Sequence, residues 1–294
     1  NGLSFTYSNE NYTVDLSNYQ LKKLDKESKE ESNPFESVSP NKKWIAFETI
    51  LRREIRRFMR IWPQTLLPPV ITIILYFVIF GQLIGSRIGT MSGLPYIQFV
   101  APGLIMMSVI TNSYSNVVSS FFGSKFQRNI EELLVSPTPS WIILLGYVVG
   151  GMCRGLGVGL IVTVLSLYFA DFSLHSAPIT IGIVLLTSLM FSLAGLINAV
   201  FARNFDDISI IPTFVLTPLT YLGGVFYSID LLGDFWGTVS LINPVLYMVN
   251  AFRYGIAGIS DINIIWAFAM VGLFSLTLFL VALNLLEKGA RLRS

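Results

Sequence analysis

Six long apolar runs constrain this chain more than any other feature of its sequence. Each approaches or exceeds the roughly 20 residues that an α-helix needs to cross a bilayer core of about 30 Å. The runs lie at residues 62–84, 97–122, 139–169, 178–201, 208–226 and 262–286. The composition agrees, because 53% of the 294 residues are hydrophobic and only 13% are charged. The sequence therefore predicts an all-α, polytopic membrane protein with six transmembrane helices.

The basic residues beside these runs predict which side of the membrane holds the chain ends. An even number of spans places both ends on one side, and cytoplasmic loops are enriched in Lys and Arg. Only Arg87 and Arg253 fall in the loops of the opposite side. The side of the termini holds Lys42, Lys43, Arg52, Arg53, Arg56, Arg57, Arg60, Lys125, Arg128, Arg203, Lys288, Arg291 and Arg293. Both termini are therefore predicted to be cytoplasmic.

The polar sequence before the first run divides into two parts. Residues 1–40 are rich in Asn, Ser, Lys and Glu and are predicted to be a disordered extension, with a docking strand near their start as the alternative. Residues 41–61 repeat apolar side chains at spacings of three and four, with arginines between them. This pattern predicts a basic amphipathic helix in the membrane interface, although such a helix could also pack on a soluble domain. Its interfacial residues are Trp44, Arg52, Arg53, Arg56, Arg57 and Trp62.

The segment before the last run, residues 228–260, is too apolar for a free loop. Glycines and the pair Asn243–Pro244 interrupt it, so it cannot form one spanning helix. Irregular backbone is not tolerated against lipid. We therefore predict short re-entrant helices that pack against protein near the outer surface.

A short charged segment interrupts the apolar pattern between the second and third runs, at residues 124–136. Apolar and charged side chains take different faces of the predicted helix, and Arg128 is spaced to pair with a glutamate one turn later. Pro137 ends the helix because it disfavours α geometry at Ser136. Two interpretations remain open, an ordinary cytoplasmic turn or a helix that docks in a groove of a soluble partner. The docking residues would be Phe126, Gln127, Arg128, Ile130, Glu131, Glu132 and Leu133.

Polar side chains form a stripe along the second run, and one arginine lies within the third. Hydroxyl and amide groups in hydrocarbon must find partners, so the stripe serves either hydrogen bonds between helices or a substrate path. Arg154 lies about midway through its run, where a charge costs about 2.5–3.5 kcal/mol and needs a partner or water. Nearby Gly151, Gly155 and Gly159, spaced by four, predict close helix packing. The substrate-path candidates are Ser108, Asn112, Ser115, Asn116, Ser119 and Arg154.

Signatures of catalysis are not found in the sequence. It contains no G-x-x-x-x-G-K-[ST] phosphate loop, no H-E-x-x-H and no G-x-S-x-G. The single Cys153 and the single His175 cannot build a disulfide framework or a Cys/His metal site. An intramembrane hydrolase is disfavoured because no catalytic pair lies at mid-depth. We expect no enzyme, no metal and no nucleic-acid partner, and an energy source outside this chain.

Three long segments, in order, resemble the permease subunit of ABC-2-type transporters. They are "FVAPGLIMMSVITNSYSNVVSSFFGSKFQRNIEELLVSP", "FDDISIIPTFVLTPLTYLGGVFYSI" and "NPVLYMVNAFRYGI". The resemblance covers about residues 41–294 and departs from the family in the longer N-terminal extension. It implies a homodimer in the bacterial inner membrane that pairs with two cytoplasmic ABC ATPase subunits, which bind ATP and Mg. It also implies that the helix at 124–136 is the coupling helix.

The predicted function is therefore that of a transmembrane permease in an ATP-driven exporter or flippase. The cargo classes that the family implies are lipids, glycolipids, polysaccharides and hydrophobic drugs. The alternative is a membrane scaffold or sensor that binds an ATPase and transports nothing. The polar stripe and Arg154 fit an amphiphile with an anionic headgroup, and neutral lipids and drugs fit almost as well.

Overall fold

The computed structural model describes residues 2–7, 10–15, 20–23 and 40–289. The chain divides into two units, Asn1–Ser39 and Pro40–Ser294, and each is described by itself.

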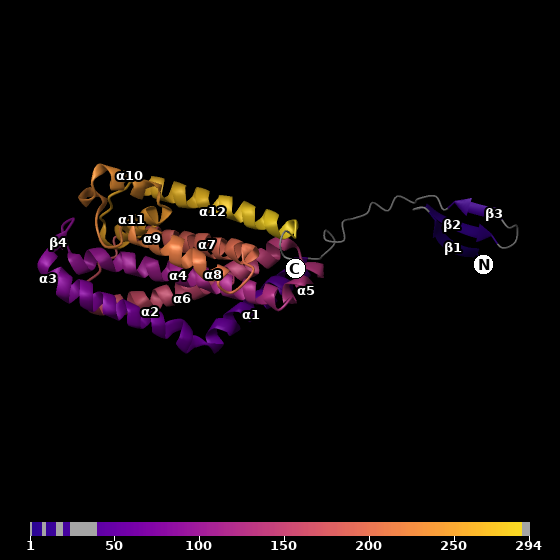
Figure 1. The fold of residues 1–294 in the computed structure, drawn as a ribbon, viewed down its shortest axis with the longest axis horizontal. Coiled ribbons are helices and arrows are strands. Elements are labelled where there is room, and N and C mark those ends of the chain that lie inside the picture. The colour runs from indigo at the N-terminus through magenta and orange to yellow at the C-terminus, as the bar shows by residue number, and fades with distance from the viewer. Residues whose placement is uncertain (1, 8–9, 16–19, 24–39, 290–294) are drawn as a thin grey trace. The chain divides into compact units, whose positions relative to one another are not determined.

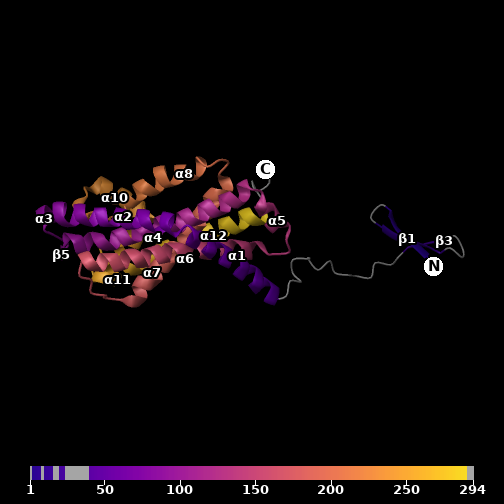
Figure 2. The same ribbon diagram turned by 90° about the horizontal axis from the view of Figure 1, so that it is seen from below.

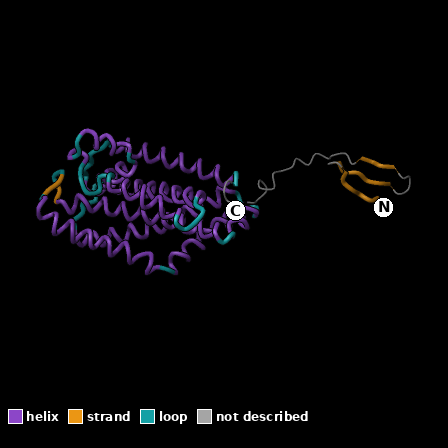
Figure 3. Tube along the Cα trace, in the orientation of Figure 1, coloured by secondary structure: helices purple, strands orange, loops and turns teal. Residues whose placement is uncertain are grey.

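The first unit contains three short strands, β1 (Gly2–Tyr7), β2 (Glu10–Asp15) and β3 (Gln20–Lys23). They form an antiparallel sheet in the order β1-β2-β3, shown in orange in Figure 3. Apolar residues alternate with polar ones in the first two strands, a period that suits a strand. The expectation of disorder across residues 1–40 is therefore wrong for these strands, whereas residues 24–39 lie outside the described part.

The second unit is helical. The helices of its first half are α1 (Pro40–Arg60), α2 (Trp62–Tyr76), the π-helix η1 (Phe77–Ile84), α3 (Gly85–Ile88), α4 (Tyr96–Phe126), α5 (Asn129–Val135) and α6 (Ser140–Phe169). A two-strand hairpin, β4 (Thr90–Met91) and β5 (Leu94–Pro95), joins α3 to α4. The second half holds α7 (Ala177–Phe201), α8 (Asp207–Ile211), the π-helix η2 (Pro212–Leu216), α9 (Thr217–Tyr221), the 3-10 helix η3 (Ile229–Leu231), α10 (Asp234–Ile242), α11 (Pro244–Ala257) and α12 (Ile264–Glu287).

The long helices run roughly side by side, with α4 between its neighbours α6 and α7 (Figures 1 and 2). One end of the bundle carries α3, α10 and α11, and the other carries α5, in both views. We call these the α10 end and the α5 end. Most of α4 is buried, including Phe99, Leu104, Ile110 and Phe121, so it forms the centre of the core.

Four helical segments of the described chain are long and apolar enough to cross a membrane. They are Trp62–Ile88, Ser140–Phe169, Ala177–Phe201 and Ile264–Glu287. α4 has 31 residues, which is ample length, but its polar side chains lower its hydropathy. The run predicted at 208–226 forms α8, η2 and α9, which together span only Asp207–Tyr221. A polytopic all-α membrane fold is confirmed, and the count of six spans stays a prediction.

Two short helices occupy the segment before the last span. α10 has 9 residues and α11 has 14, so each is too short to cross a bilayer. The break falls where the sequence predicts it, because Asn243 Oδ1 accepts a hydrogen bond from Val245 N at 3.0 Å and Pro244 begins α11. These helices have the form expected of re-entrant elements, and their depth in the membrane stays a prediction.

Candidate functional site

Helix α1 packs against α6 through two glycines. A Cβ atom at Gly146 would lie 2.5 Å from Ile50 Cγ2, and one at Gly150 would lie 2.6 Å from Glu54 Cβ. Only glycine permits such an approach between two helices. One face of the predicted interfacial helix is therefore covered by protein, while Trp44 on another face is exposed.

A buried carboxylate lies at this contact. Glu54 has 1% of its side chain exposed, and its oxygens lie 3.4 Å from Arg53 Nη2 and 3.4 Å from Arg57 Nε. Arg53 also donates a hydrogen bond to the Tyr147 hydroxyl of α6. Removing one partner of such a group leaves an uncompensated buried charge, which is strongly destabilising. The network thus fixes the register of α1 on α6.

Arg57 extends the network to α4. Its Nη2 atom donates to the Asn116 carbonyl oxygen at 2.9 Å and to Asn116 Oδ1 at 2.8 Å, and Nη1 reaches Ser119 Oγ at 3.5 Å. Two members of the predicted substrate path, Asn116 and Ser119, therefore bind Arg57. Arg53 and Arg57, both predicted for the membrane interface, also contact other helices, Arg53 through Tyr147 and Arg57 through Asn116, and their place at the interface stays a prediction. The period of the helix shows which residues share a face, but not what covers that face.

The other four path candidates line one pocket of about 300 Å³ between α2, α4 and α6. Ser108, Asn112 and Ser115 come from α4, and Arg154 comes from α6. Arg154 Nε is buried and has no hydrogen-bond partner among the described residues. The charged neighbour that acts on it electrostatically is Arg57, which carries the same sign. The pocket therefore offers an anion an unsatisfied guanidinium beside hydroxyl and amide groups.

A second, larger pocket of about 820 Å³ lies between α1 and the last turns of α4. Its lining includes Arg52, Arg53, Glu54, Arg56, Arg57, Arg60, Ser119, Ser120, Ser124 and Gln127. We call it the basic pocket. Arg52 pairs with Glu48 of its own helix, whereas Arg56 and Arg60 have no polar partner among the described residues. Trp62 follows directly at the start of α2 and is 54% exposed.

The predicted docking segment is shorter than residues 124–136. α4 continues to Phe126, Arg128 adopts a left-handed conformation with φ at +63°, and only Asn129–Val135 forms α5. Ser136 is extended before Pro137, as predicted. Phe126 is 61% exposed and Ile130 is fully buried. Of the other proposed docking residues, Gln127, Arg128 and Glu132 are exposed, and Glu131 and Leu133 are partly buried.

Two details of the predicted helix are corrected by this break. Arg128 forms no ion pair with Glu131 or Glu132 among the described residues, because it precedes α5 and does not belong to a continuous helix. For the same reason Phe126 and Ile130 do not share one face. A left-handed conformation at an arginine is uncommon, and nothing in the sequence signals it.

Sequence reasoning missed Arg253, which it counted only as a loop charge. The side chain is fully buried in α11, with its guanidinium 3.7 Å from the centre of the Phe99 ring. Its Nη2 atom donates to the Gly224 carbonyl at 2.6 Å and its Nε atom to the Phe99 carbonyl at 3.2 Å. One side chain thus ties α11 to α4 and to the loop after α9. No local pattern could reveal this, because Phe99 is 154 positions away in the sequence.

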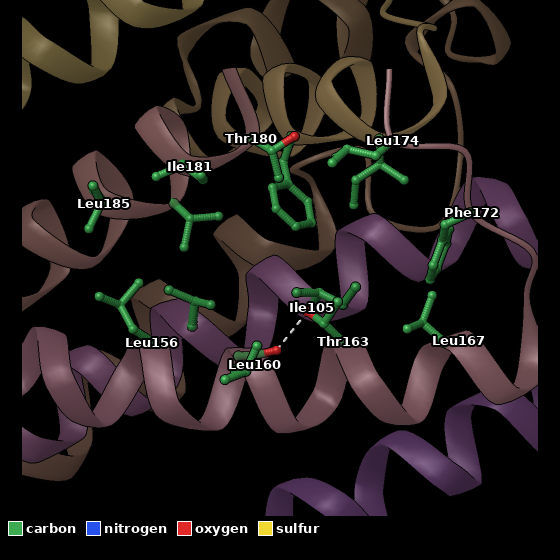
Figure 4. A pocket seen from close by; sticks show the side chains of 15 residues that line it. Ile105, Leu156, Leu160, Thr163, Leu167, Phe172, Leu174, Thr180, Ile181 and Leu185 are labelled. Carbon is green, nitrogen blue, oxygen red and sulfur yellow. Dashed lines mark hydrogen bonds between the residues drawn. The ribbon is translucent and has the colours of Figure 1, made fainter. Parts of the chain in front are cut away.

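A third pocket, of about 550 Å³, is almost wholly apolar (Figure 4). It lies between α4, α6, α7 and α11, and the side chains of Leu160, Leu167 and Ile181 point into it. Its two hydroxyls are satisfied within their own helices, since Thr163 donates to the Gly159 carbonyl and Thr180 to the Ser176 carbonyl. Among the described residues, no group of three or more His, Cys, Asp or Glu is placed to hold a metal ion.

Comparison with known proteins defines the class of protein. The ABC-2 type transporter family matches residues 45–257, so the chain belongs to this family of permease-type transport subunits. It is 58% identical over 251 residues to the inner membrane transport permease YadH of Escherichia coli (strain K12), covering 85% of this chain and 98% of that protein. The same identity is found with YadH of Shigella flexneri. Nodulation protein J of Rhizobium leguminosarum bv. viciae is 22% identical over 220 residues, covering 73% of this chain and 83% of that protein.

Proposed function

We propose that this chain is the membrane subunit of an ATP-driven exporter or flippase that works with a separate cytoplasmic ABC ATPase. Two copies of the chain and two ATPase subunits would form the working unit, and the ATPases would bind ATP and Mg. The α5 end would face the cytoplasm, as the basic loops predict. The cargo would be a lipid, a glycolipid, a polysaccharide or a hydrophobic drug of the bacterial inner membrane.

The observation that carries the proposal is how firmly α5 is attached to the bundle. Ile130 of α5 is fully buried, so the helix cannot move without its surroundings. One turn before it, Lys125 Nζ donates to the carbonyls of Val200 at 2.7 Å and Ala202 at 2.8 Å, at the end of α7. A partner that pushes on α5 would therefore displace α4 and α7 together.

The outer surface of this element suits a protein partner. Phe126 is exposed and packs edge to face on Phe205, from the loop after α7, with ring centres 5.0 Å apart. Val135 at the end of α5 is 82% exposed, and Glu132 lies exposed between them in the sequence. Exposed apolar residues at the end of α4 and at the end of α5, with an exposed charge between them, offer a partner both apolar and polar contacts. ATP binding would then rock the spans and change access to the pocket that contains Arg154.

The test is the charge reversal Glu132→Arg, made in the permease produced together with its ATPase. We expect cargo-stimulated ATP hydrolysis to fall by about tenfold, because reversing a charge at a docking surface disturbs its electrostatic complementarity and costs on the order of 1–2 kcal/mol or more. Membrane insertion and folding should be unchanged, since Glu132 is exposed.

The matched control is Asp171→Arg, which reverses an exposed carboxylate in the loop between α6 and α7, away from α5. Equal ATP hydrolysis in both variants and the unmodified protein would refute the docking role of α5. Transport or lipid scrambling in proteoliposomes separates an exporter from a scaffold. Normal coupling with no movement of any cargo would favour the scaffold.

A further inference from the structure

The basic pocket carries positive charge that the described residues do not neutralise. Five arginines line it, and the carboxylates near them are Glu54, which lines it, and Glu48, which pairs with Arg52. Glu54 is already engaged by Arg53 and Arg57. Arg56 and Arg60 have no polar partner among the described residues. An anion in the pocket would meet at least two free guanidinium groups.

The neutral groups of the pocket also suit a phosphate. Ser119, Ser120 and Ser124 present hydroxyls from α4, and Gln127 adds an amide. Guanidinium groups bind phosphate oxygens through paired N–H donors, and hydroxyls complete the shell of such a site. Because five arginines converge here from a single helix, the pocket favours a group with more than one charged oxygen.

We propose that the basic pocket binds the phosphate of an anionic phospholipid headgroup from the adjoining membrane leaflet. The surface next to the pocket selects a lipid over a soluble phosphate. Ile61 lines the pocket at the point where α1 gives way to α2, and the exposed Trp62 follows it. Leu67, Ile71 and Leu75 of α2 are exposed apolar residues. A headgroup in the pocket would thus leave its acyl chains beside a helix with exposed apolar side chains.

A row of polar residues along α4 leads from the basic pocket to the pocket of Arg154. Ser119 lines the basic pocket, Asn116 one turn further binds Arg57, and Asn112 and Ser115 line the pocket of Arg154. Arg57 lines the basic pocket and donates to Asn116, which follows Ser115 of the Arg154 pocket in the sequence. A phosphate that reached Arg154 would meet its unpartnered Nε atom. This extension rests on the transport role proposed above, but the binding site itself does not.

Native mass spectrometry of the full-length permease in detergent tests the site, with phosphatidylglycerol as the probe and phosphatidylcholine as the zwitterionic reference. The variant is Arg56→Gln with Arg60→Gln, which removes the two unpartnered guanidinium groups and leaves the Glu54 network intact. We expect phosphatidylglycerol to bind about fivefold more weakly for each arginine removed, since a basic residue near a membrane surface contributes about 1 kcal/mol to anionic lipid binding. Phosphatidylcholine retention should not change.

The matched control is Lys42→Gln with Lys43→Gln, which removes the same charge from the same helix outside the pocket. We expect less than a twofold effect for it. An equal loss in both variants would overturn the proposal in favour of diffuse attraction along α1. Displacement of phosphatidylglycerol by inorganic phosphate in modest excess would overturn the lipid source and assign the site to soluble phosphate. Lipid binding is measured without the ATPase, so its result does not depend on whether α5 couples to the ATPase.

Discussion

Three buried or half-buried cationic groups of this chain differ in how their charge is compensated. Arg57 lies 3.4 Å from the Glu54 carboxylate of its own helix and donates hydrogen bonds to Asn116 of α4 through Nη2, although its Nε atom has no hydrogen-bond partner among the described residues. Within the described part of the chain Arg253 forms no ion pair, but it donates to two backbone carbonyls and lies against an aromatic face. Arg154 has an unsatisfied Nε atom at a pocket. A buried charged group that lacks a hydrogen-bond partner and lines a cavity is suited to bind a ligand. A buried charged group whose hydrogen bonds are made within the protein stabilises the fold.

Replacing Arg253 should therefore destabilise the α10 end of the bundle. In Arg253→Met the carbonyls of Phe99 and Gly224 lose hydrogen bonds to a charged group, each worth about 1.5–3 kcal/mol. We expect a clear fall in the thermal unfolding midpoint of the purified permease, followed by intrinsic fluorescence. Arg253→Lys should recover part of this, because an ammonium group keeps the charge but cannot reach both carbonyls with fixed geometry.

The matched control is Arg87→Gln, an exposed arginine of α3 at the same end of the bundle. Exposed substitutions of this kind usually change stability by less than about 0.5 kcal/mol. An unfolding midpoint for Arg253→Met that equals the midpoint of Arg87→Gln would show that Arg253 does not hold α11 to α4.

Helix α6 uses its glycines on two faces. Gly146 and Gly150 allow α1 to approach closely. On another face, three glycines allow close approach of α4: Gly151 at Val117, Gly155 at Ser113 and Gly159 at Val109. The predicted role of these glycines in close packing is confirmed. Their distribution also means that a helix at the edge of the bundle, α1, is held as closely as the central one.

A single added methyl group should separate α1 from α6. In Gly150→Ala the new Cβ atom would lie 2.6 Å from Glu54 Cβ and 3.0 Å from Glu54 Cγ, so α1 must move. Overpacking of this kind costs about 1–3 kcal/mol. We expect faster amide hydrogen exchange in residues 40–60 and a lower unfolding midpoint.

Gly157 supplies the control on the same helix, because a Cβ atom there would have nothing within 4 Å. Gly157→Ala should leave exchange in α1 unchanged and stabilise α6 by about 0.5–1 kcal/mol through helix propensity. Equal exchange rates in the two variants would show that α1 is not held by this contact.

The elements of the bundle were largely predictable from the sequence, and the contacts between them were not. The long apolar runs predicted where the helices lie. Pro137 and Asn243–Pro244 predicted two helix boundaries, because proline restricts the backbone of its immediate neighbours. The spacing of four in the α6 glycines signalled close packing, but it could not say that α1 would be one partner. The buried contacts of Arg253 were not predictable, because its partners are distant in the sequence. Four of the six predicted substrate-path residues line the pocket of Arg154, since polar groups in an apolar helix must meet a polar or protein environment, and the path itself stays a prediction.

The arrangement of the two ends makes a prediction about the molecule as a whole. The loop between α6 and α7 is hydrogen-bonded to α11, through His175 N to the Ile256 carbonyl at 3.2 Å and Ser176 N to the Gly255 carbonyl at 2.8 Å. This loop and α11 therefore lie together at the α10 end of the bundle, and α5 lies at the other end (Figure 1). We predict that the two ends face opposite sides of the membrane and that the segment Asp207–Tyr221 connects them, although it is shorter than the roughly 20 residues that a full span needs.

Single cysteines test this arrangement in a Cys153→Ser background. Val135→Cys lies in α5, Leu174→Cys in the α6–α7 loop and Phe235→Cys in α10, and the native side chain is well exposed at each position. We expect a membrane-impermeant maleimide to label Leu174→Cys and Phe235→Cys in intact cells, and Val135→Cys only after permeabilisation. Protection of Phe235→Cys together with labelling of Leu174→Cys would show that Asp207–Tyr221 does not cross, and the chain would have an odd number of spans. Labelling of Val135→Cys in intact cells would reverse the predicted orientation and remove α5 from the reach of a cytoplasmic ATPase.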